Sequence, residues 1–408
     1  MTINVRRLFT RLLPGAALAG ALVAAAAIAP SAVATVSAQD RAAAINAAAV
    51  DVAAVDYSKL VADNKENSTS PANLGGWGYT QGLFLWGTYL IYKRTGERKY
   101  LTYMKAWADR FVDANGHLSN GFGSLDSMRS GTVLIALARE YPNDSRYRKG
   151  ATQIRNRLKT FPRTKNDGQP GAFWHATSRQ NQLWADGVFM VLPFLLYYGQ
   201  TIGEASTLNA EVVRNLNIYW KHLYDPQTGL LRHAYDESRS QSWANKTTGQ
   251  APENWCRAIG WYGMTIIEAL DILPASQAGR ADLLDHTRTL VAGFKRWQDP
   301  KTGRWFQLPA KPTLSGNWTE TSCSSMYTYT ISRAVEKGYV DPDYKTVSAK
   351  GYQGVLARVS SKGDVAEICI GTNVGNQGYY LARQRKTNDL HGLGAFLIMN
   401  EQLAKTGS

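Results

Sequence analysis

The chain has 408 residues, ordinary globular composition and a formal net charge of +14, which is long enough for one large domain or two medium ones. This charge favours an anionic partner, such as nucleic acid or an acidic polysaccharide, through long-range attraction. The sequence contains no basic run of the kind that nucleic-acid-binding proteins show, so we expect no nucleic-acid partner.

The first 38 residues have the pattern of an export signal. Arg6, Arg7 and Arg11 precede an alanine-rich apolar stretch, and small residues follow up to Ala38. The stretch is too short and too rich in alanine for a membrane span, and the paired arginines also resemble a twin-arginine signal. We expect removal of residues 1–38, which carry three arginines and no acids, to leave one periplasmic or extracellular domain of residues 39–408 with a charge of +11 and no membrane attachment.

Three cysteines occur, Cys256, Cys323 and Cys369, and none lies in the signal region. An odd number leaves at least one free thiol even if two cysteines pair. The sequence does not say whether any of them pair. We therefore expect stability to come from the core and not from a disulfide framework.

Helical periodicity dominates the rest of the chain, and few strand-like alternations occur. It predicts twelve helices, at 41–64, 79–95, 98–114, 126–141, 145–160, 184–201, 208–223, 257–273, 278–297, 320–337, 343–359 and 389–405. Glycine turns, such as DPQTGLLRH at 225–233 and DPKTGRWF at 299–306, recur between them. The turns are about 50 to 75 residues apart, which is the length of a helical hairpin with its loop.

Six such hairpins can close into a ring, which is an all-α (α/α)6 barrel. The more apolar helix of each hairpin would form the inner wall, because an inner helix is covered on most faces. These inner helices are 79–95, 126–141, 184–201, 257–273, 320–337 and 389–405. The first helix would pair with the last, and the loops leading into the inner helices would gather at one mouth. An open superhelical array of hairpins is the alternative.

One acid, Asp186, interrupts the apolar run QNQLWADGVFM at 180–190, just after a loop that carries His175 and Trp184. Helix capping alone would explain an acid in a first helical turn. However, Asp126 repeats the layout before the preceding inner helix, so two acids would face one mouth. Poor solvation and the charge of Asp126 would then raise the pKa of Asp186, which would act as a general acid near neutral pH.

The stretch 233–264 carries residues that suit an acidic sugar. The faces of Trp255 and Trp261 suit sugar rings, and an arginine can hold a carboxylate with two hydrogen bonds. Arg257 opens a helix, where the dipole disfavours a cation, and this indicates a ligand. Core packing for the tryptophans and a structural hydrogen bond for His233 are the alternatives.

The stretch GNWTETSCSSMYTY at 316–329 favours a capping role for Glu320 or Thr319 at the start of the next inner helix. The six histidines show no zinc-type spacing. The sequence also lacks a phosphate loop, a dinucleotide fingerprint and a G-x-S-x-G elbow. We therefore expect neither a metal nor another cofactor.

Several stretches, in combination and in this order, resemble glycoside hydrolase family 105, the unsaturated rhamnogalacturonyl hydrolases, and more distantly the unsaturated glucuronyl hydrolases. They are WGYTQGLFLWGTYLIYKRTGERKYL, LDSMRSG, FWHATSRQNQLWADGVFM, HAYDES, WCRAIGWYGM, WTETSCSSM and NDLHGLGAFLI. Together they extend through nearly all of the chain after the signal.

This resemblance implies an (α/α)6 barrel that removes a terminal 4,5-unsaturated uronic acid from oligosaccharides left by lyases. It also implies protonation of C4 and addition of water at C5, instead of displacement at the anomeric carbon. Asp186 matches the general acid/base of the family and Asp126 its partner acid. The substrate-contacting positions match His175, His233, Arg257 and Trp261, with Trp184 and Trp255 expected beside them. A glycosidase for saturated sugars and a non-catalytic carbohydrate-binding toroid are the alternatives, and galacturonyl or glucuronyl specificity is open.

Overall fold

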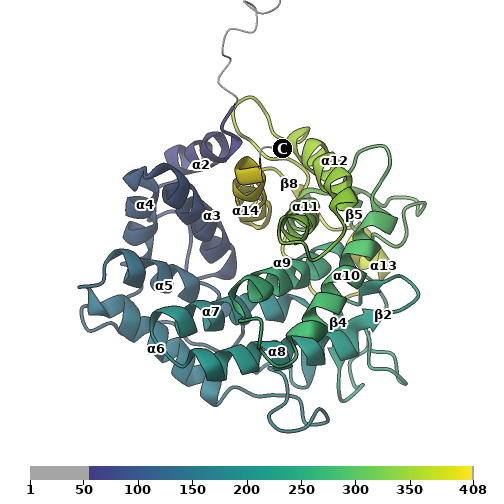
Figure 1. The fold of residues 1–408 in the computed structure, drawn as a ribbon, viewed down its shortest axis with the longest axis horizontal. Coiled ribbons are helices and arrows are strands. Elements are labelled where there is room, and N and C mark those ends of the chain that lie inside the picture. The colour runs from purple at the N-terminus through teal and green to yellow at the C-terminus, as the bar shows by residue number, and fades with distance from the viewer. Residues whose placement is uncertain (1–54, 407–408) are drawn as a thin grey trace, which may run out of the picture. The chain divides into compact units, whose positions relative to one another are not determined.

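The structure, a computed structural model, describes residues 55–406, which form two concentric layers of helices (Figure 1). The inner helices are α3 (Tyr79–Thr95), α5 (Gly131–Glu140), α7 (Asp186–Thr201), α9 (Cys256–Ile272), α11 (Thr321–Glu336) and α14 (Leu390–Thr406). The outer helices are α2 (Tyr57–Ser68), α4 (Arg98–Ala108), α6 (Ser145–Lys159), α8 (Ala205–Leu223), α10 (Arg280–Trp297) and α12 (Lys345–Leu356).

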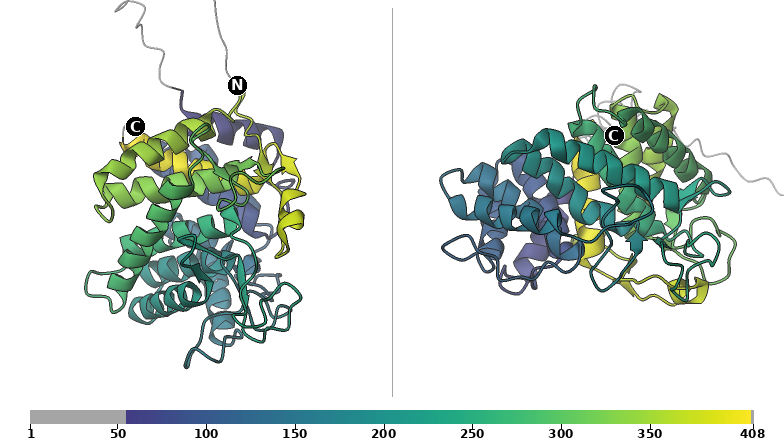
Figure 2. Two further views of the ribbon diagram at one scale, coloured as in Figure 1. Left: turned by 90° about the vertical axis from the view of Figure 1, so that its right-hand side faces the viewer. Right: turned by 90° about the horizontal axis from the view of Figure 1, so that it is seen from below.

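Each inner helix contacts the next inner helix along the chain, and α14 contacts α3, so the ring is closed. The C-terminal helix, yellow in Figure 2, lies beside the purple N-terminal helices and contacts both α2 and α3. The predicted (α/α)6 barrel is therefore confirmed, and the open array of hairpins is excluded.

The inner helices are apolar because both of their sides are covered. Every residue from Cys256 to Leu270 in α9 is buried, whereas the outer helix α4 buries residues at helical spacing, among them Tyr100, Met104 and Trp107. This difference is the one that separates fully buried helices from amphipathic ones. No helix within residues 55–406 is long and apolar enough to cross a membrane.

Some predicted boundaries change. The expected signal, 1–38, and residues 41–54 of the first expected helix lie outside the described residues. Helix α2 begins at Tyr57, because the Asp56 side chain caps it by accepting a hydrogen bond of 3.1 Å from the amide of Lys59. The expected helix 98–114 ends at Ala108.

The inner helices at the two candidate acids also begin later than the periodicity predicts. Residues 126–128 form a 3-10 turn, η1 (Asp126–Met128), and α5 follows from Gly131. The residues before α7 form a strand, and the helix itself begins at Asp186.

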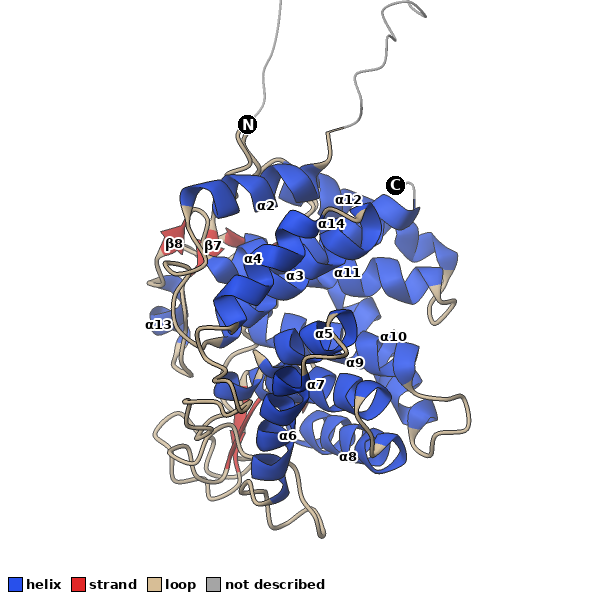
Figure 3. Cartoon of the chain, turned by 90° about the vertical axis from the view of Figure 1, so that its left-hand side faces the viewer, coloured by secondary structure: helices blue, strands red, loops and turns tan. Residues whose placement is uncertain are grey.

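Short strands lie in the loops, and Figure 3 shows some of them with the longest loops along one side of the ring. They form four antiparallel pairs: β1 (Gln182–Trp184) with β4 (Ala234–Asp236), β2 (Tyr224–Asp225) with β3 (Leu230–Leu231), β5 (Trp305–Phe306) with β6 (Thr319–Glu320), and β7 (Ile368–Cys369) with β8 (Arg385–Lys386). Two short helices, η2 (Pro342–Tyr344) and α13 (Gln377–Leu381), complete the described elements. Strands of two or three residues are too short for an alternating pattern to reveal them.

A disulfide joins the beginnings of two neighbouring inner helices. Cys256 is the first residue of α9, and its partner Cys323 lies in the first turn of α11. Cys369 is buried and free, in agreement with the expected unpaired thiol. Glu320 caps α11 by accepting hydrogen bonds from the amides of Ser322 and Cys323 at 3.0 and 2.7 Å, which confirms its predicted capping role.

Candidate active site

A cavity of about 220 Å³ lies at the end of the ring where the inner helices begin. It is lined by Tyr79, Asp126, His175, Arg179, Trp184, Asp186, Met190, Gly371, Thr372 and Asn373. Tyr79 and Asp186 are the first residues of α3 and α7, and the remaining residues come mainly from loops. Four residues predicted from the sequence, Asp126, His175, Trp184 and Asp186, therefore meet in one cavity.

The pairing of β1 with β4 brings His233 to Asp186. Trp184 lies opposite Ala234, and the amide of Ala185 donates to the carbonyl of His233 at 2.9 Å. The Nε2 atom of His233 consequently lies 3.1 Å from Oδ2 of Asp186. The other ring nitrogen, Nδ1, is 2.6 Å from the Tyr380 hydroxyl. If Tyr380 donates to Nδ1, a neutral His233 carries its own proton on Nε2, on the side of Asp186.

Asp186 is ionised in the free protein. Burial acts to raise the pKa of this carboxyl, but the adjacent His233 and the nearby His175 outweigh burial and hold the pKa below its ordinary value. For His233, burial has the opposite effect and lowers the pKa, although Asp186 acts to raise it. The prediction that Asp186 holds a proton near neutral pH is therefore wrong for the free protein, because two histidines from separate segments set its charge.

Three buried polar atoms at this site have no hydrogen-bond partner within residues 55–406: Oδ2 of Asp186, Nε2 of His233 and Nδ1 of His175. The first two are close enough for a hydrogen bond but are not aligned for one. Unpaired buried polar groups are rare in folded proteins and call for an explanation. A polar ligand in the cavity would supply the missing partners.

The two acids have different surroundings. The Asp186 side chain is 12% exposed, whereas that of Asp126 is 35% exposed. His175 lies near both acids, with its Nε2 atom 3.7 Å from Oδ2 of Asp126. Its ring stacks on Trp184 at 4.5 Å between centroids, so His175 covers one face of the Trp184 ring.

A hydrogen-bonded series of three side chains supports another wall of the cavity. The Tyr79 hydroxyl lies 2.5 Å from Nε2 of His391, and Nδ1 of His391 lies 2.5 Å from Asp389. Burial and the charge of Asp126 raise the pKa of Tyr79, so the hydroxyl stays protonated. Tyr79 and His391 are 312 positions apart and meet only when the ring closes. The one signal that could have found them is their place in stretches that carry the family resemblance.

Arg179 is the one arginine or lysine among the described residues that line this cavity. Its guanidinium lies over the Trp184 ring, 4.1 Å from the centroid, and donates to Oδ1 of Asn373 at 3.0 Å. It forms no ion pair with any acid of residues 55–406, so its other donors are available to a ligand. Arg179 ends a short turn that begins at Ala176, and a loop position of this kind has no periodic signal in the sequence.

Arg257 lies behind the cavity and does not line it. It is 1% exposed, and it donates to the carbonyls of Cys369 and Ile370 and to the Ser322 hydroxyl. Its hydrogen bonds hold the loop from which Gly371, Thr372 and Asn373 form one wall of the cavity.

Two predicted substrate-contacting tryptophans lie in the core. The Trp255 ring packs on His233 and Tyr380, at centroid distances of 4.6 and 6.0 Å. The Trp261 ring stacks on Phe189 at 4.6 Å. Neither lines the cavity, so their placement corresponds to the packing alternative.

One group of potential metal ligands, Cys256, Glu320 and Cys323, lies close together within residues 55–406. The two sulfurs are bonded to each other. The Glu320 carboxylate already accepts hydrogen bonds from the amide and hydroxyl of Ser322 and from the amides of Cys323 and Cys369. This donor set is therefore committed to the fold and does not suit a metal ion.

Comparisons of sequence and structure find known proteins that are similar to this chain. Residues 54–406 match Glycosyl Hydrolase Family 88. A solved glycoside hydrolase of family 105 from C. acetobutylicum ATCC 824 is 30% identical, with a TM-score of 0.80 over 86% of this chain and 100% of that chain. Protein Atu3128 of Agrobacterium fabrum is 32% identical over 51% of this chain and 96% of that protein. The unsaturated rhamnogalacturonyl hydrolase YesR of Bacillus subtilis is 23% identical over 73% of this chain and 80% of that protein.

Proposed function

Because the chain belongs to glycosyl hydrolase families 88 and 105 and is a glycoside hydrolase, we propose that it removes a terminal 4,5-unsaturated uronic acid from lyase-generated oligosaccharides. The observation that carries this proposal is the composition of the cavity, in which two acids, Asp126 and Asp186, lie beside an unpaired guanidinium, Arg179. The activity in the name of the relative YesR supports the same substrate class.

In the proposed reaction, Asp186 donates a proton to C4 of the C4=C5 double bond, and positive charge develops at C5 and the ring oxygen. Water adds at C5, and the Asp186 carboxylate accepts the proton that this water loses. The resulting hemiketal opens to a ketone at C5, and the ring oxygen stays on C1 as a hydroxyl. C1 then becomes an aldehyde and releases the rest of the chain as an alcohol, so one water is consumed.

The proton for this reaction must be taken up with the substrate, because Asp186 is ionised in the free protein. A substrate carboxylate in the cavity adds negative charge near Asp186, and the bound sugar excludes water from it. Both changes raise the pKa of an acid. The neutral His233 ring, fixed by Tyr380, would hold the Asp186 carboxyl in place.

We assign the uronate carboxylate to Arg179 and not to Arg257. The donors of Arg257 are committed to backbone carbonyls, whereas Arg179 faces the cavity and has no ion-pair partner in the described part of the chain. A planar guanidinium can bind a carboxylate through two parallel hydrogen bonds. The positive charge of the chain as a whole would also attract acidic oligosaccharides.

The test uses rhamnogalacturonan fragments produced by a lyase, with saturated fragments of the same length as the control. Hydration removes the C4=C5 double bond, so the ultraviolet absorbance of the unsaturated uronate should fall as the terminal sugar is released. Cleavage of either substrate without loss of absorbance would show a glycosidase for saturated sugars. Binding without cleavage would show a carbohydrate-binding toroid.

Arg179→Gln is expected to reduce kcat/KM for the unsaturated uronate by about 10- to 100-fold, the scale of one hydrogen-bonded charge contact. Arg179→Lys should recover only part of this loss, because lysine keeps the charge but not the planar pair of donors.

The matched control for Arg179 is the methyl ester of the same substrate, which has no carboxylate charge. The variants should lose little activity on this ester relative to the wild type. An equal loss on acid and ester would mean that Arg179 only packs on Trp184. Unchanged kinetics on both substrates would place the carboxylate elsewhere.

We further propose that the enzyme acts outside the cytoplasm. The export pattern of residues 1–38 supports this location, and so does the buried Cys256–Cys323 disulfide, since disulfides persist mainly in oxidising compartments. The exported protein should begin near Gln39. Sequencing of its N-terminus checks this expectation, and exported material that still begins at Met1 would contradict it.

A further inference from the structure

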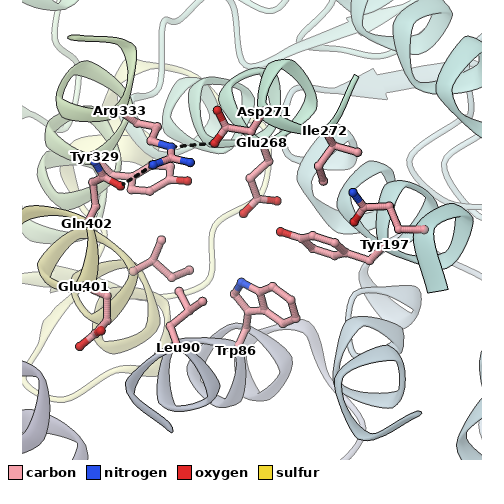
Figure 4. A pocket seen from close by; sticks show the side chains of 12 residues that line it. Trp86, Leu90, Tyr197, Glu268, Asp271, Ile272, Tyr329, Arg333, Glu401 and Gln402 are labelled. Carbon is pink, nitrogen blue, oxygen red and sulfur yellow. Dashed lines mark hydrogen bonds and ion pairs between the residues drawn. The ribbon is translucent and has the colours of Figure 1, made fainter. Parts of the chain in front are cut away.

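A second cavity, of about 210 Å³, lies at the opposite end of the ring, where the inner helices end (Figure 4). It is lined by Trp86, Leu90, Tyr197, Gln200, Glu268, Asp271, Ile272, Tyr329, Arg333, Ile398, Glu401 and Gln402. Five of the six inner helices, α3, α7, α9, α11 and α14, contribute to it. None of these residues lines the candidate active site.

Glu268 is the exceptional residue of this second cavity. It is 6% exposed, and its Oε2 atom has no hydrogen-bond partner in the part of the chain that the structure describes. Figure 4 shows its carboxyl group pointing into the cavity, in the direction of the Tyr197 side chain. Burial raises the pKa of this carboxyl to about 7, although Arg129 and the Tyr197 hydroxyl act in the opposite direction.

The surroundings of Glu268 favour a positive ligand. Asp271 is paired with Arg333 at 2.7 Å, and Glu401 is paired with Arg94 at 2.8 Å, so Glu268 is the one acid of this lining without an ion-pair partner among the described side chains. The last turns of α7, α9 and α11 also line the cavity, and the C-terminal end of a helix carries a partial negative charge. A cation in the cavity would therefore be attracted by the helix ends and by Glu268.

Arg129 is not the cation that pairs with Glu268 in this cavity. It is fully buried, and its guanidinium lies 3.9 Å from the centroid of the Phe189 ring. It forms no ion pair with Glu268 and is not among the residues that line the second cavity. Arg129 therefore lowers the pKa of Glu268 without forming an ion pair with it. The side of the Glu268 carboxyl that faces the cavity remains open to a ligand.

The ligand should be an organic cation and not a metal ion. Within residues 55–406, the acids of this lining do not converge closely enough to coordinate one ion. The cavity volume is several times the volume of about 30 Å³ that a water molecule occupies. Aromatic rings of Trp86, Tyr197 and Tyr329 form part of its wall, and they suit the carbon skeleton of an organic ammonium ion.

We propose that the second cavity binds a small organic ammonium ion, whose charge pairs with Glu268 and whose carbon skeleton packs against Trp86 and Tyr329. This site is separate from the proposed hydrolysis and does not depend on it. Binding requires the ionised form of Glu268. Affinity should therefore rise with pH through about 7, the pKa of this carboxyl, and level off above it.

The experiment is calorimetric titration of the full chain with benzylammonium chloride, with benzyl alcohol as a neutral probe of similar size. Measurements one pH unit below and one above the pKa of Glu268 should differ roughly tenfold in benzylammonium affinity, because the ionised fraction differs by that factor. Benzyl alcohol should bind at neither pH. Equal binding of the two probes, or no binding of either, would overturn the proposal.

Three variants locate the probe. Glu268→Gln should weaken benzylammonium binding at least tenfold, whereas Glu66→Gln should not. Glu66 is a suitable control because burial raises its pKa to about 8, yet it lies in α2 outside the cavity. Asp186→Asn should also bind normally, and loss of binding there would place the ammonium ion in the candidate active site. If Glu268→Gln does not fold, the pH dependence of the wild type still decides the question.

Discussion

Replacing Asp186 with asparagine is expected to reduce kcat by about 10² to 10⁴, the usual contribution of a general acid, while the ring stays folded. Asparagine keeps the shape of the side chain at the start of α7 but cannot transfer a proton. Asp126→Asn should also impair turnover, because it removes the second acid of the cavity. Turnover is followed by ultraviolet absorbance, with circular dichroism as the check of folding.

The pH dependence of kcat/KM tests the role of Asp186 independently. The pKa of Asp186 is lowered in the free protein, so the carboxyl is ionised near neutral pH and must gain a proton when substrate binds. Wild-type kcat/KM should therefore fall by about tenfold per unit as pH rises above that pKa, because kcat/KM reports the free enzyme. A folded Asp186→Asn protein with near-normal turnover would leave Asp186 only a role at the helix terminus.

Removal of the Cys256–Cys323 disulfide, by the double variant Cys256→Ala and Cys323→Ala, is expected to lower the free energy of unfolding by about 4 kcal/mol. This value follows from the loss of the unfolded-state constraint over the 67 residues that separate the two cysteines. Urea unfolding followed by tryptophan fluorescence measures it. Loss of the disulfide should also loosen Arg257, the residue next to Cys256, and with it the cavity wall that Arg257 holds.

Reductant separates the effect of the disulfide from the effect of changing two buried side chains. Reductant present during unfolding should destabilise the wild type and the Cys369→Ala control, in which the disulfide remains. It should not affect the double variant. Equal stability of oxidised and reduced wild type would show that the ring does not depend on this bond.

The ring could be predicted from the sequence because its cause is local. A helix that lies between an outer layer and the centre of the ring must be apolar on most faces, as the unbroken burial from Cys256 to Leu270 shows. Glycine turns at regular intervals then gave the number of hairpins. The capping role of Glu320 was likewise visible, because its partners are two and three positions away.

The electrostatics of Asp186 could not be predicted because their cause is not local. His233 reaches this acid through the pairing of two three-residue strands, β1 and β4, which no alternating pattern reveals. The sequence suggests a solitary acid among apolar residues, whose pKa would rise. The structure adds a histidine 3.1 Å away, which reverses the direction of the shift.

The two arginines show a related difficulty. The position of Arg257 at the start of a helix suggested a ligand, yet its unusual place is explained by the carbonyls of Cys369 and Ile370. Arg179 lies in an irregular loop and reaches the cavity only because Trp184 and Asn373 hold its side chain. Each arginine has a partner far away in the sequence, Cys369 and Ile370 for Arg257 and Asn373 for Arg179.

The position of α14 has a consequence for how the protein is made. This helix is an inner one, and it closes the ring by contacting both α3 and α11, yet it is synthesised after all the other helices of the ring. Until Leu390–Thr406 has emerged, the nascent chain has a gap along an apolar wall, and Tyr79 lacks its final neighbour His391. Contacts between the two ends of a chain form slowly, and exposed apolar surface invites aggregation in the meantime. Chaperone protection is therefore most valuable in the interval between the synthesis of α11 and the docking of α14.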